Sequence, residues 1–111
     1  MITIEPNNTR MNFGEALEML KRGHKVAREG WNGKNMFIYL TEGSIVHYDD
    51  LTGAAKKHIT EDVTGLSDCC IKSHIDMKAA DGTIVVGWLA SQTDMVAEDW
   101  HVIIGGTQDE N

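Results

Sequence analysis

The most distinctive part of this 111-residue chain reads Gly87-Trp88-Leu89-Ala90-Ser91-Gln92-Thr93-Asp94-Met95-Val96-Ala97-Glu98-Asp99-Trp100. It holds two of the three tryptophans, three acidic residues and a helix-start signal. Each tryptophan combines a large rigid ring with one N–H group that needs a hydrogen-bond acceptor when it is buried. Two tryptophans so close together therefore indicate a binding platform as well as a hydrophobic core.

The same segment predicts a short helix followed by a strand. Ser91 and Asp94 stand three positions apart, which is the spacing of a capping box, in which each side chain bonds the backbone N–H of the other residue. We expect a helix from this point to about Ala97. The alternation from Trp100 to Ile104 then predicts a strand.

Upstream of this segment, a β-hairpin is predicted around Ala80-Asp81-Gly82. Asp-Gly between two β-rich stretches is among the stronger short-range hairpin signals. The stretches here are Ile71 to Met77 and Thr83 to Trp88. They are expected to pair as two antiparallel strands.

A longer helix is predicted near the start of the chain. Asn12 and Glu15 have capping-box spacing, and Gly23 offers a left-handed stop. Between them, apolar residues recur at helical spacing, at Phe13, Ala16, Leu17 and Leu20. This pattern predicts one amphipathic helix.

A second pair of strands is expected after that helix. Residues 25–28 and 36–40 have strand-like patterns and flank a turn that contains Asn32-Gly33. Both turn residues tolerate a positive φ. Trp31 is therefore expected at the edge of a loop.

The middle of the chain has weaker signals. Asp49 or Asp50 is a candidate cap for a helix over residues 49–59. Residues 60–73 are polar with scattered apolar positions and predict a long irregular connection, of a length that usually serves a function.

These elements predict an α+β fold, with an antiparallel sheet of about four to five strands, one main N-terminal helix and a short second helix. The 111 residues are expected to form a single domain. Residues 1–10 read as an N-terminal extension and residues 105–111 as a flexible tail.

Charge and hydropathy exclude several kinds of partner. The formal net charge is −7 and the pI is about 5.0, which argues against affinity for nucleic acid polymers and anionic membranes. No run approaches the roughly 18 apolar residues of a membrane span, and the N-terminus lacks the basic and apolar regions of a signal peptide. We therefore expect a cytoplasmic protein.

Neither a disulfide nor a metal is expected. Cys69 and Cys70 are adjacent, and a disulfide between neighbours requires a strained geometry. The five histidines match no zinc-binding spacing, and there is no Cys-x-x-Cys pair. No cofactor is predicted.

Motifs for enzymatic chemistry are missing from the sequence. It has no Gly-x-Ser-x-Gly, no phosphate-binding P-loop and no His-Glu-x-x-His. Asp94, Glu98 and Asp99 could form an acid pair or a Mg²⁺ site. The alternative, which we favour, places Asp94 in the capping box and the other two acids on a solvated turn.

The tryptophans point to a nucleotide. Trp31 lies close to Arg28 and Lys34, and Trp88 precedes the small residues Ala90 and Ser91 at a predicted helix start. Aromatic faces accept a base by stacking, and backbone N–H groups at a helix start favour an anion. The alternative is that Trp88 and Trp100 are core anchors and Trp31 caps the edge of the core.

Three sequence words closely resemble the second Thoeris anti-defence family, a group of small phage and prophage proteins once catalogued as a domain of unknown function. These words are residues 11–17 (Met-Asn-Phe-Gly-Glu-Ala-Leu), residues 26–34 (Val-Ala-Arg-Glu-Gly-Trp-Asn-Gly-Lys) and residues 88–100, which begin Trp-Leu-Ala-Ser-Gln-Thr-Asp. They occur in order and span nearly the whole of residues 11–103.

The resemblance implies a sponge rather than an enzyme. Members of the family bind a cyclic ADP-ribose isomer made by TIR-domain enzymes of the Thoeris system and hold it without cleaving it. Some members also bind cyclic di- or trinucleotides at a separate site. The resemblance further implies a homotetramer with ligand pockets between subunits, acting in the cytoplasm of the infected bacterial host.

Carried over residue by residue, the resemblance places three aromatic residues around the base and ribose groups: Phe13, Trp31 and Trp88. It places the polar groups near the ribose hydroxyls and the pyrophosphate as follows: Arg28, Asn32, Ser91 and Asp94. Ala90 joins the ligand-binding set beside Ser91, and Trp100 is assigned to packing. The chain departs from short family members in an insertion over residues 49–73 and in its N-terminal extension.

Three hypotheses therefore stand after the sequence alone. The first is a sponge for a nucleotide signal. The second is a phosphodiesterase or glycohydrolase that uses Asp94, Glu98 or Asp99. The third is a structural or protein-binding module in which the tryptophans are interface anchors.

Overall fold

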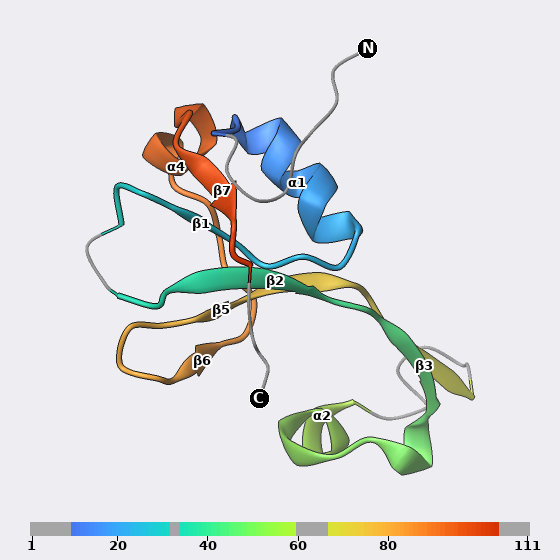
Figure 1. Cartoon of the computed structure of the whole chain (residues 1–111). Helices are drawn as coiled ribbons and strands as arrows, with labels where there is room; N and C mark the ends of the chain where they lie inside the picture. Colours follow the sequence, from blue (N-terminus) through green and yellow to red (C-terminus); the bar gives the residue numbers. More distant parts are fainter. Residues whose placement is uncertain (1–9, 32–33, 60–66, 105–111) are drawn as a thin grey trace. The chain divides into compact units, whose positions relative to one another are not determined.

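A computed structural model describes residues 10–31, 34–59 and 67–104 of the chain (Figure 1). The chain divides into two compact units. The first comprises Met1–Thr41 and Ile75–Asn111, and the second comprises Glu42–His74. Among the described residues, no helix is long and apolar enough to cross a membrane.

The first unit is built on a five-stranded sheet with the strand order β6-β5-β2-β1-β7. Strand β1 pairs antiparallel with both β2 and β7, and β5 pairs antiparallel with β6. The strands are β1 (Val26–Arg28), β2 (Phe37–Thr41), β5 (His74–Lys78), β6 (Ile84–Val85) and β7 (Trp100–Val102). With the helices below, this confirms the predicted α+β fold and the predicted pairing around residues 30–34.

Helix α1 (Phe13–Lys21) forms as predicted. The Glu15 backbone N–H donates to Asn12 Oδ1 and the Asn12 backbone N–H donates to Glu15 Oε1, both at 2.9 Å, so the capping box is complete. Gly23 follows the helix with φ +94°, the left-handed stop that the sequence predicts. The helix packs against β7 and α4 (Gln92–Val96), as Figure 1 shows.

One hydrophobic core lies between α1 and the sheet. Met11 forms an isolated bridge with Trp100, each backbone N–H donating to the other residue's carbonyl at 2.8 and 3.1 Å. This bridge brings the entry to α1 against β7. The buried core residues are Met11, Ala16, Met19, Leu20, Val26, Ile38, Met77, Trp100 and Val102.

The Asp81-Gly82 hairpin is confirmed, although its second strand is shorter than predicted. Gly82 has φ +92°, and Asp81 Oδ1 accepts from the backbone N–H of Thr83 at 3.0 Å. Strand β6 ends at Val85 because Gly87, at φ +83°, turns the chain out of the strand direction. The prediction that the first strand starts at Ile71 is wrong, since β5 starts at His74.

The second unit corrects two predictions. Helix α2 (Gly53–His58) is preceded by the N-cap Thr52, and Asp49 and Asp50 lie instead in the 3₁₀ turn η1 (Tyr48–Asp50). The predicted irregular connection contains a strand, β4 (Asp68–Ile71), which pairs with β3 (Ser44–His47) in a two-stranded sheet. No turn signal links these two strands, so local patterns could not reveal their pairing. Residues 60–66 lie outside the described residues.

Candidate functional site

Four aromatic side chains from distant parts of the chain meet in the first unit: Phe13, Trp31, Trp88 and Trp100. We call them the aromatic cluster. Trp100 is at its centre, with its ring centroid 5.4 Å from Phe13, 5.3 Å from Trp31 and 6.3 Å from Trp88. Trp100 is fully buried, and its Nε1–H donates to the Asp94 carbonyl at 3.0 Å. Trp100 is thus a packing residue with its polar atom satisfied.

The other three rings are only partly buried and lean on one another. Trp88 contacts Phe13 edge-on at a centroid distance of 6.4 Å and Trp31 at 6.3 Å. Such edge-to-face contacts fix the relative angles of the rings. Ring surface therefore remains available to a planar ligand on side chains that are already held in place.

Asp94 connects the aromatic cluster to helix α4. Its backbone N–H donates to Ser91 Oγ at 3.1 Å, and its Oδ2 accepts from the Ser91 backbone N–H at 3.0 Å, which completes the predicted capping box. Its Oδ1 accepts from Arg28 Nη1 at 2.9 Å and from Trp31 Nε1 at 3.3 Å. One carboxylate thus holds a helix start, a cation and an aromatic ring.

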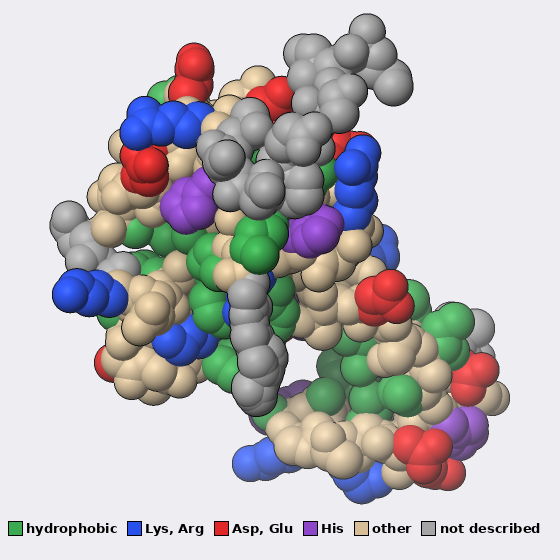
Figure 2. All heavy atoms as spheres, in the orientation of Figure 1, with side chains coloured by type: hydrophobic (Ala, Val, Ile, Leu, Met, Phe, Trp, Pro, Cys, Tyr) green, Lys and Arg blue, Asp and Glu red, His purple; other side chains and the backbone are tan. Residues whose placement is uncertain are grey.

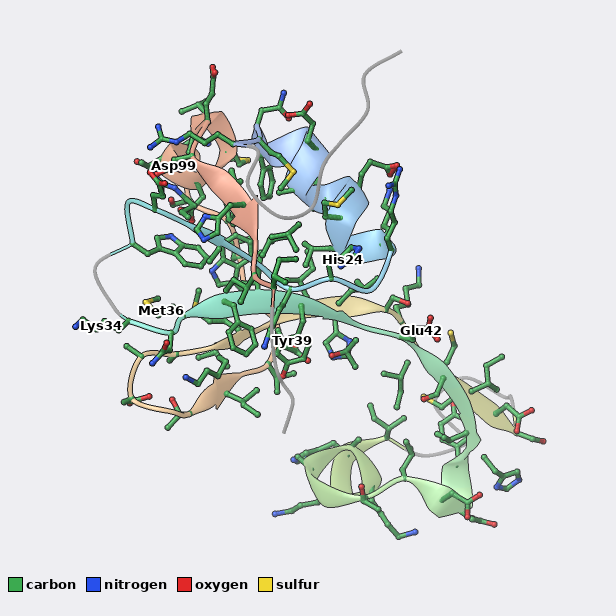
Figure 3. All side chains as sticks on the ribbon, in the orientation of Figure 1. His24, Lys34, Met36, Tyr39, Glu42 and Asp99 are labelled. Atoms are coloured by element: carbon green, nitrogen blue, oxygen red, sulfur yellow. The ribbon has the colours of Figure 1, made fainter. Side chains whose placement is uncertain are left out.

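Arg28 lies between two carboxylates. Besides its bond to Asp94, its Nε donates to Asp99 Oδ1 at 2.9 Å, and the Gly30 backbone N–H donates to Asp99 Oδ2 at 2.8 Å. The three charged side chains are 11–23% exposed. We call Arg28, Asp94 and Asp99 the charged triad; Asp99 is labelled in Figure 3.

The pKa values of the triad follow from these bonds. The hydrogen bond from Arg28 lowers the pKa of Asp99 below its ordinary value, and the Gly30 N–H adds to this effect against the opposing effect of burial. Burial alone would raise the pKa of Asp94, but hydrogen bonds from Ser91, Arg28 and Trp31 outweigh it and leave that pKa lowered as well. The bond to Asp99 is the largest cause of the raised pKa of Arg28.

The triad therefore stays fully ionised near neutral pH, with two negative charges and one positive. Two of the guanidinium nitrogens of Arg28 are engaged by carboxylates of the same chain. Carboxylate oxygens accept hydrogen bonds and do not donate them when ionised. The arrangement suits hydroxyl groups, such as those of a ribose, and leaves only limited positive charge for a phosphate.

Comparison with known proteins gives a family. Residues 11–103 match the model of the Tad2-like domain, described as a Thoeris anti-defense 2-like domain. A protein of Bacillus phage SP01 named "Thoeris anti-defense 2" is 44% identical over 95 residues, which cover 86% of this chain and 97% of that protein. The chain belongs to the Thoeris anti-defense 2 family.

The matched region of this family begins at Met11, where the chain forms its bridge to Trp100, and ends just after β7. It includes the whole of the second unit, most of the first, and every residue that the sequence singled out as a ligand-binding candidate. The family resemblance stated from three sequence words is thereby confirmed.

The structure brings most of the predicted site residues together. The residues that converge on the aromatic cluster and the charged triad are Phe13, Arg28, Trp31, Trp88, Ser91 and Asp94. Ala90 is half-buried beside Ser91. Asn32 lies outside the described residues. Trp31, expected at a loop edge, packs on the core with its indole N–H bonded to Asp94.

Sequence reasoning misplaced one acidic residue and did not single out another. Asp99 does not lie on a simple solvated turn, because it binds both Arg28 and the Gly30 backbone. Asp76 is buried in β5 and was not singled out at all. Asp99 meets Arg28 because β1 pairs with β7 in the register Arg28↔Trp100, and no local pattern encodes a contact across 71 positions.

The acids give little support to a metal site. Within the part of the chain that the structure describes, no group of three or more His, Cys, Asp or Glu side chains is arranged to hold a metal ion. Glu98 is exposed, while the carboxylates of Asp94 and Asp99 both bind Arg28. An acid pair at this point would have a guanidinium between its two members.

The lowered pKa of Asp99 predicts a pH-dependent contribution to stability. Between the lowered value and the ordinary value of 3.8, the unfolded chain binds more protons than the folded chain. The free energy of unfolding therefore falls as pH falls through this interval, and the contribution is complete above about pH 5. Asp99→Asn should lower the free energy of unfolding at pH 7 by about 1 kcal/mol and flatten its dependence on pH below about 4.

Urea unfolding followed by tryptophan fluorescence at several pH values measures both effects. Glu98→Gln is the matched control, since it removes a neighbouring exposed carboxylate that takes no part in the triad. The same unfolding free energies for Asp99→Asn and Glu98→Gln across this range would contradict the assignment.

Proposed function

We propose that this chain is an anti-defence sponge that binds and sequesters a cyclic ADP-ribose isomer of the 1''–3' linked type without cleaving it. The signal would be the product of a TIR-domain enzyme in the cytoplasm of the infected bacterial host. The observation that carries the proposal is the Asp94 carboxylate, which holds Trp31 and helix α4 beside the partly exposed ring of Trp88. The name of the phage relative, "Thoeris anti-defense 2", supports the anti-defence part of this proposal.

The aromatic cluster supplies the affinity for the base. Stacking of a base on an aromatic side chain contributes roughly 1–3 kcal/mol. Phe13, Trp31 and Trp88 already contact one another, so little side-chain entropy is lost when a ligand stacks on them. The adenine of the proposed ligand can stack on such preformed rings.

The charged triad supplies specificity for ribose. Its ionised carboxylates accept hydrogen bonds from hydroxyl groups, and the bonds to Arg28 fix the positions of both carboxylates. A ribose with free hydroxyls satisfies such acceptors. The pyrophosphate of the ligand needs more positive charge than Arg28 offers alone, and we propose that a second copy of the chain contributes it.

The same electrostatics favours binding over hydrolysis. A general base works best when its pKa lies near the operating pH, and a general acid must hold a proton at that pH. The pKa values of Asp94 and Asp99 are lowered by their hydrogen bonds, which makes both carboxylates weak bases and poor acids. This argues against the phosphodiesterase and glycohydrolase alternatives.

Exposed apolar side chains beside the site support an oligomer. Leu89 is 89% exposed directly after Trp88, and Val96 is 75% exposed at the end of α4. Apolar side chains next to a ligand site often belong to a protein interface. We propose a homotetramer with the ligand pocket between subunits, which would enclose more of a charged ligand than one small domain can.

Polymeric nucleic acid and membrane surfaces remain unsuitable partners. The chain carries a net charge of −7. On the face shown in Figure 2, the basic side chains of the described residues form no continuous patch. The anionic partner is therefore a small molecule held by local groups.

The first prediction of this proposal is the recovery of intact ligand. The protein is incubated with the 1''–3' linked cyclic ADP-ribose isomer, separated from free ligand by filtration and heat-denatured, and the supernatant is analysed by mass spectrometry. We expect the intact isomer in an amount proportional to the protein. Linear ADP-ribose in its place would overturn the sponge in favour of an enzyme.

Two variants control this experiment. Trp88→Ala should retain little ligand, because it removes ring surface from the aromatic cluster. Phe37→Ala removes an aromatic residue that packs on Tyr39 at 6.1 Å and under Lys25 at 4.5 Å, outside the cluster, and should retain the ligand. The same assay with cyclic di- and trinucleotides tests the second ligand class that the resemblance implies.

The second prediction concerns the assembly. Leu89→Asp should reduce the mass of the native oligomer and weaken binding of the isomer, because a carboxylate at this position would have to be buried in the proposed interface. Ile45→Asp is the matched control, since Ile45 is 71% exposed but lies on β3 in the second unit. Native mass spectrometry and calorimetry measure both. A Leu89→Asp protein with wild-type mass and affinity would contradict an interface at Leu89.

A further inference from the structure

Two carboxylates are buried in the described part of the chain, and they bracket the segment that carries Trp88. Asp76 is 5% exposed and Asp94 is 8% exposed. Asp76 accepts from the Gly87 backbone N–H at 2.9 Å, and Asp94 accepts from the Ser91 backbone N–H at 3.0 Å. The segment from Gly87 to Ser91 is therefore held at each end by a buried carboxylate.

The two carboxylate oxygens of Asp76 accept hydrogen bonds from two different segments of the chain. Its Oδ1 takes the Gly87 N–H, and its Oδ2 accepts from Thr41 Oγ1 on β2 at 2.6 Å. The next residue is fixed as well, because the Trp88 backbone N–H donates to the Ile75 carbonyl at 2.7 Å. Strand β5 thus accepts hydrogen bonds from two consecutive residues of the segment. The Gly87 N–H donates to a side chain of the strand, and the Trp88 N–H donates to its backbone.

This anchoring matters because Gly87 is conformationally free by itself. It has φ +83°, in the region that glycine enters without steric cost. A glycine directly before Trp88 gives the backbone at this point more freedom than any other residue would. The hydrogen bond from the Gly87 N–H to Asp76 restricts that freedom directly before Trp88, whose ring is proposed to bind the ligand.

A buried carboxylate is tolerated here because its oxygens are hydrogen-bonded. Burying a charge costs free energy, and directed hydrogen bonds offset that cost. The hydrogen bond that Asp76 accepts from the Gly87 N–H is what a hydrophobic residue could not reproduce.

We propose that Asp76 is a positioning residue, which sets the orientation of Trp88 for the nucleotide by holding the Gly87 N–H. The nature of the ligand rests on the proposed function above. The anchoring of Gly87 does not, and it can be measured in the free protein.

The test compares four variants. Asp76→Leu keeps the branched shape of the side chain with larger methyl groups and removes both acceptors, and Asp76→Ala is the second choice if the leucine variant does not fold. Asp76→Asn keeps an oxygen for the Gly87 N–H and is the rescue. Thr41→Val is the matched control, because it removes a different partner of the carboxylate and leaves Gly87 bonded.

Two measurements are made on each variant. Calorimetry with the 1''–3' linked cyclic ADP-ribose isomer gives the affinity, and NMR-detected hydrogen exchange gives the protection of the Gly87 amide without ligand. We expect Asp76→Leu to bind at least about tenfold more weakly and to lose Gly87 protection. Asp76→Asn and Thr41→Val should stay within about threefold of wild type and keep that protection.

Each other outcome decides the matter. Asp76→Leu with wild-type affinity, or with Gly87 still protected, would overturn the proposal, as would an equal loss of binding in Thr41→Val, which would indicate a merely structural role. If the wild-type protein does not bind the isomer, the proposed function fails. In that case the hydrogen-exchange protection of the Gly87 amide still tests the anchor. Loss of that protection in Asp76→Leu, with protection kept in Thr41→Val, would support it, and equal protection in both variants would contradict it.

Discussion

The carboxylate of Asp94 accepts hydrogen bonds from the nearby Ser91 backbone and from two side chains of a distant segment, the Arg28 guanidinium and the Trp31 indole. Its backbone carbonyl also takes the indole N–H of the buried Trp100. A buried carboxylate is stable only when its oxygens are satisfied in this way. The start of α4, the loop after β1 and the aromatic cluster therefore depend on one side chain, which makes the site a single connected unit.

This connection also sets the charge state of the site. Hydrogen bonds that hold a carboxylate in place also stabilise its ionised form, so the pKa values of Asp94 and Asp99 are both lowered. A carboxylate tuned in this direction is a dependable acceptor for hydroxyl groups and a weak participant in proton transfer. Arg28, which the resemblance places near a phosphate, donates instead to Asp94 and Asp99 of its own chain.

The features that the sequence predicted correctly are encoded over a few residues. Asn12 with Glu15, Ser91 with Asp94, and Asp81 with Gly82 each form a cap or turn whose partners are near neighbours. The strand β4 and the contact of Arg28 with Asp99 depend on strand register between distant segments, and neither could be read from local pattern. Asp76 escaped notice because it alternates with other polar residues along its strand, His74 and Lys78, and so its burial cannot be inferred before its partners are known.

The role of Asp94 is tested most directly by the affinity of Asp94→Asn for the 1''–3' linked cyclic ADP-ribose isomer, measured by calorimetry. The variant keeps the shape of the side chain but has one oxygen, which cannot serve Ser91 together with Arg28 and Trp31. Asp81→Asn, a turn aspartate bonded to Thr83, is the matched control. We expect the Asp94→Asn protein to fold and to bind the isomer at least about tenfold more weakly than both wild type and Asp81→Asn. Wild-type affinity in Asp94→Asn would contradict it.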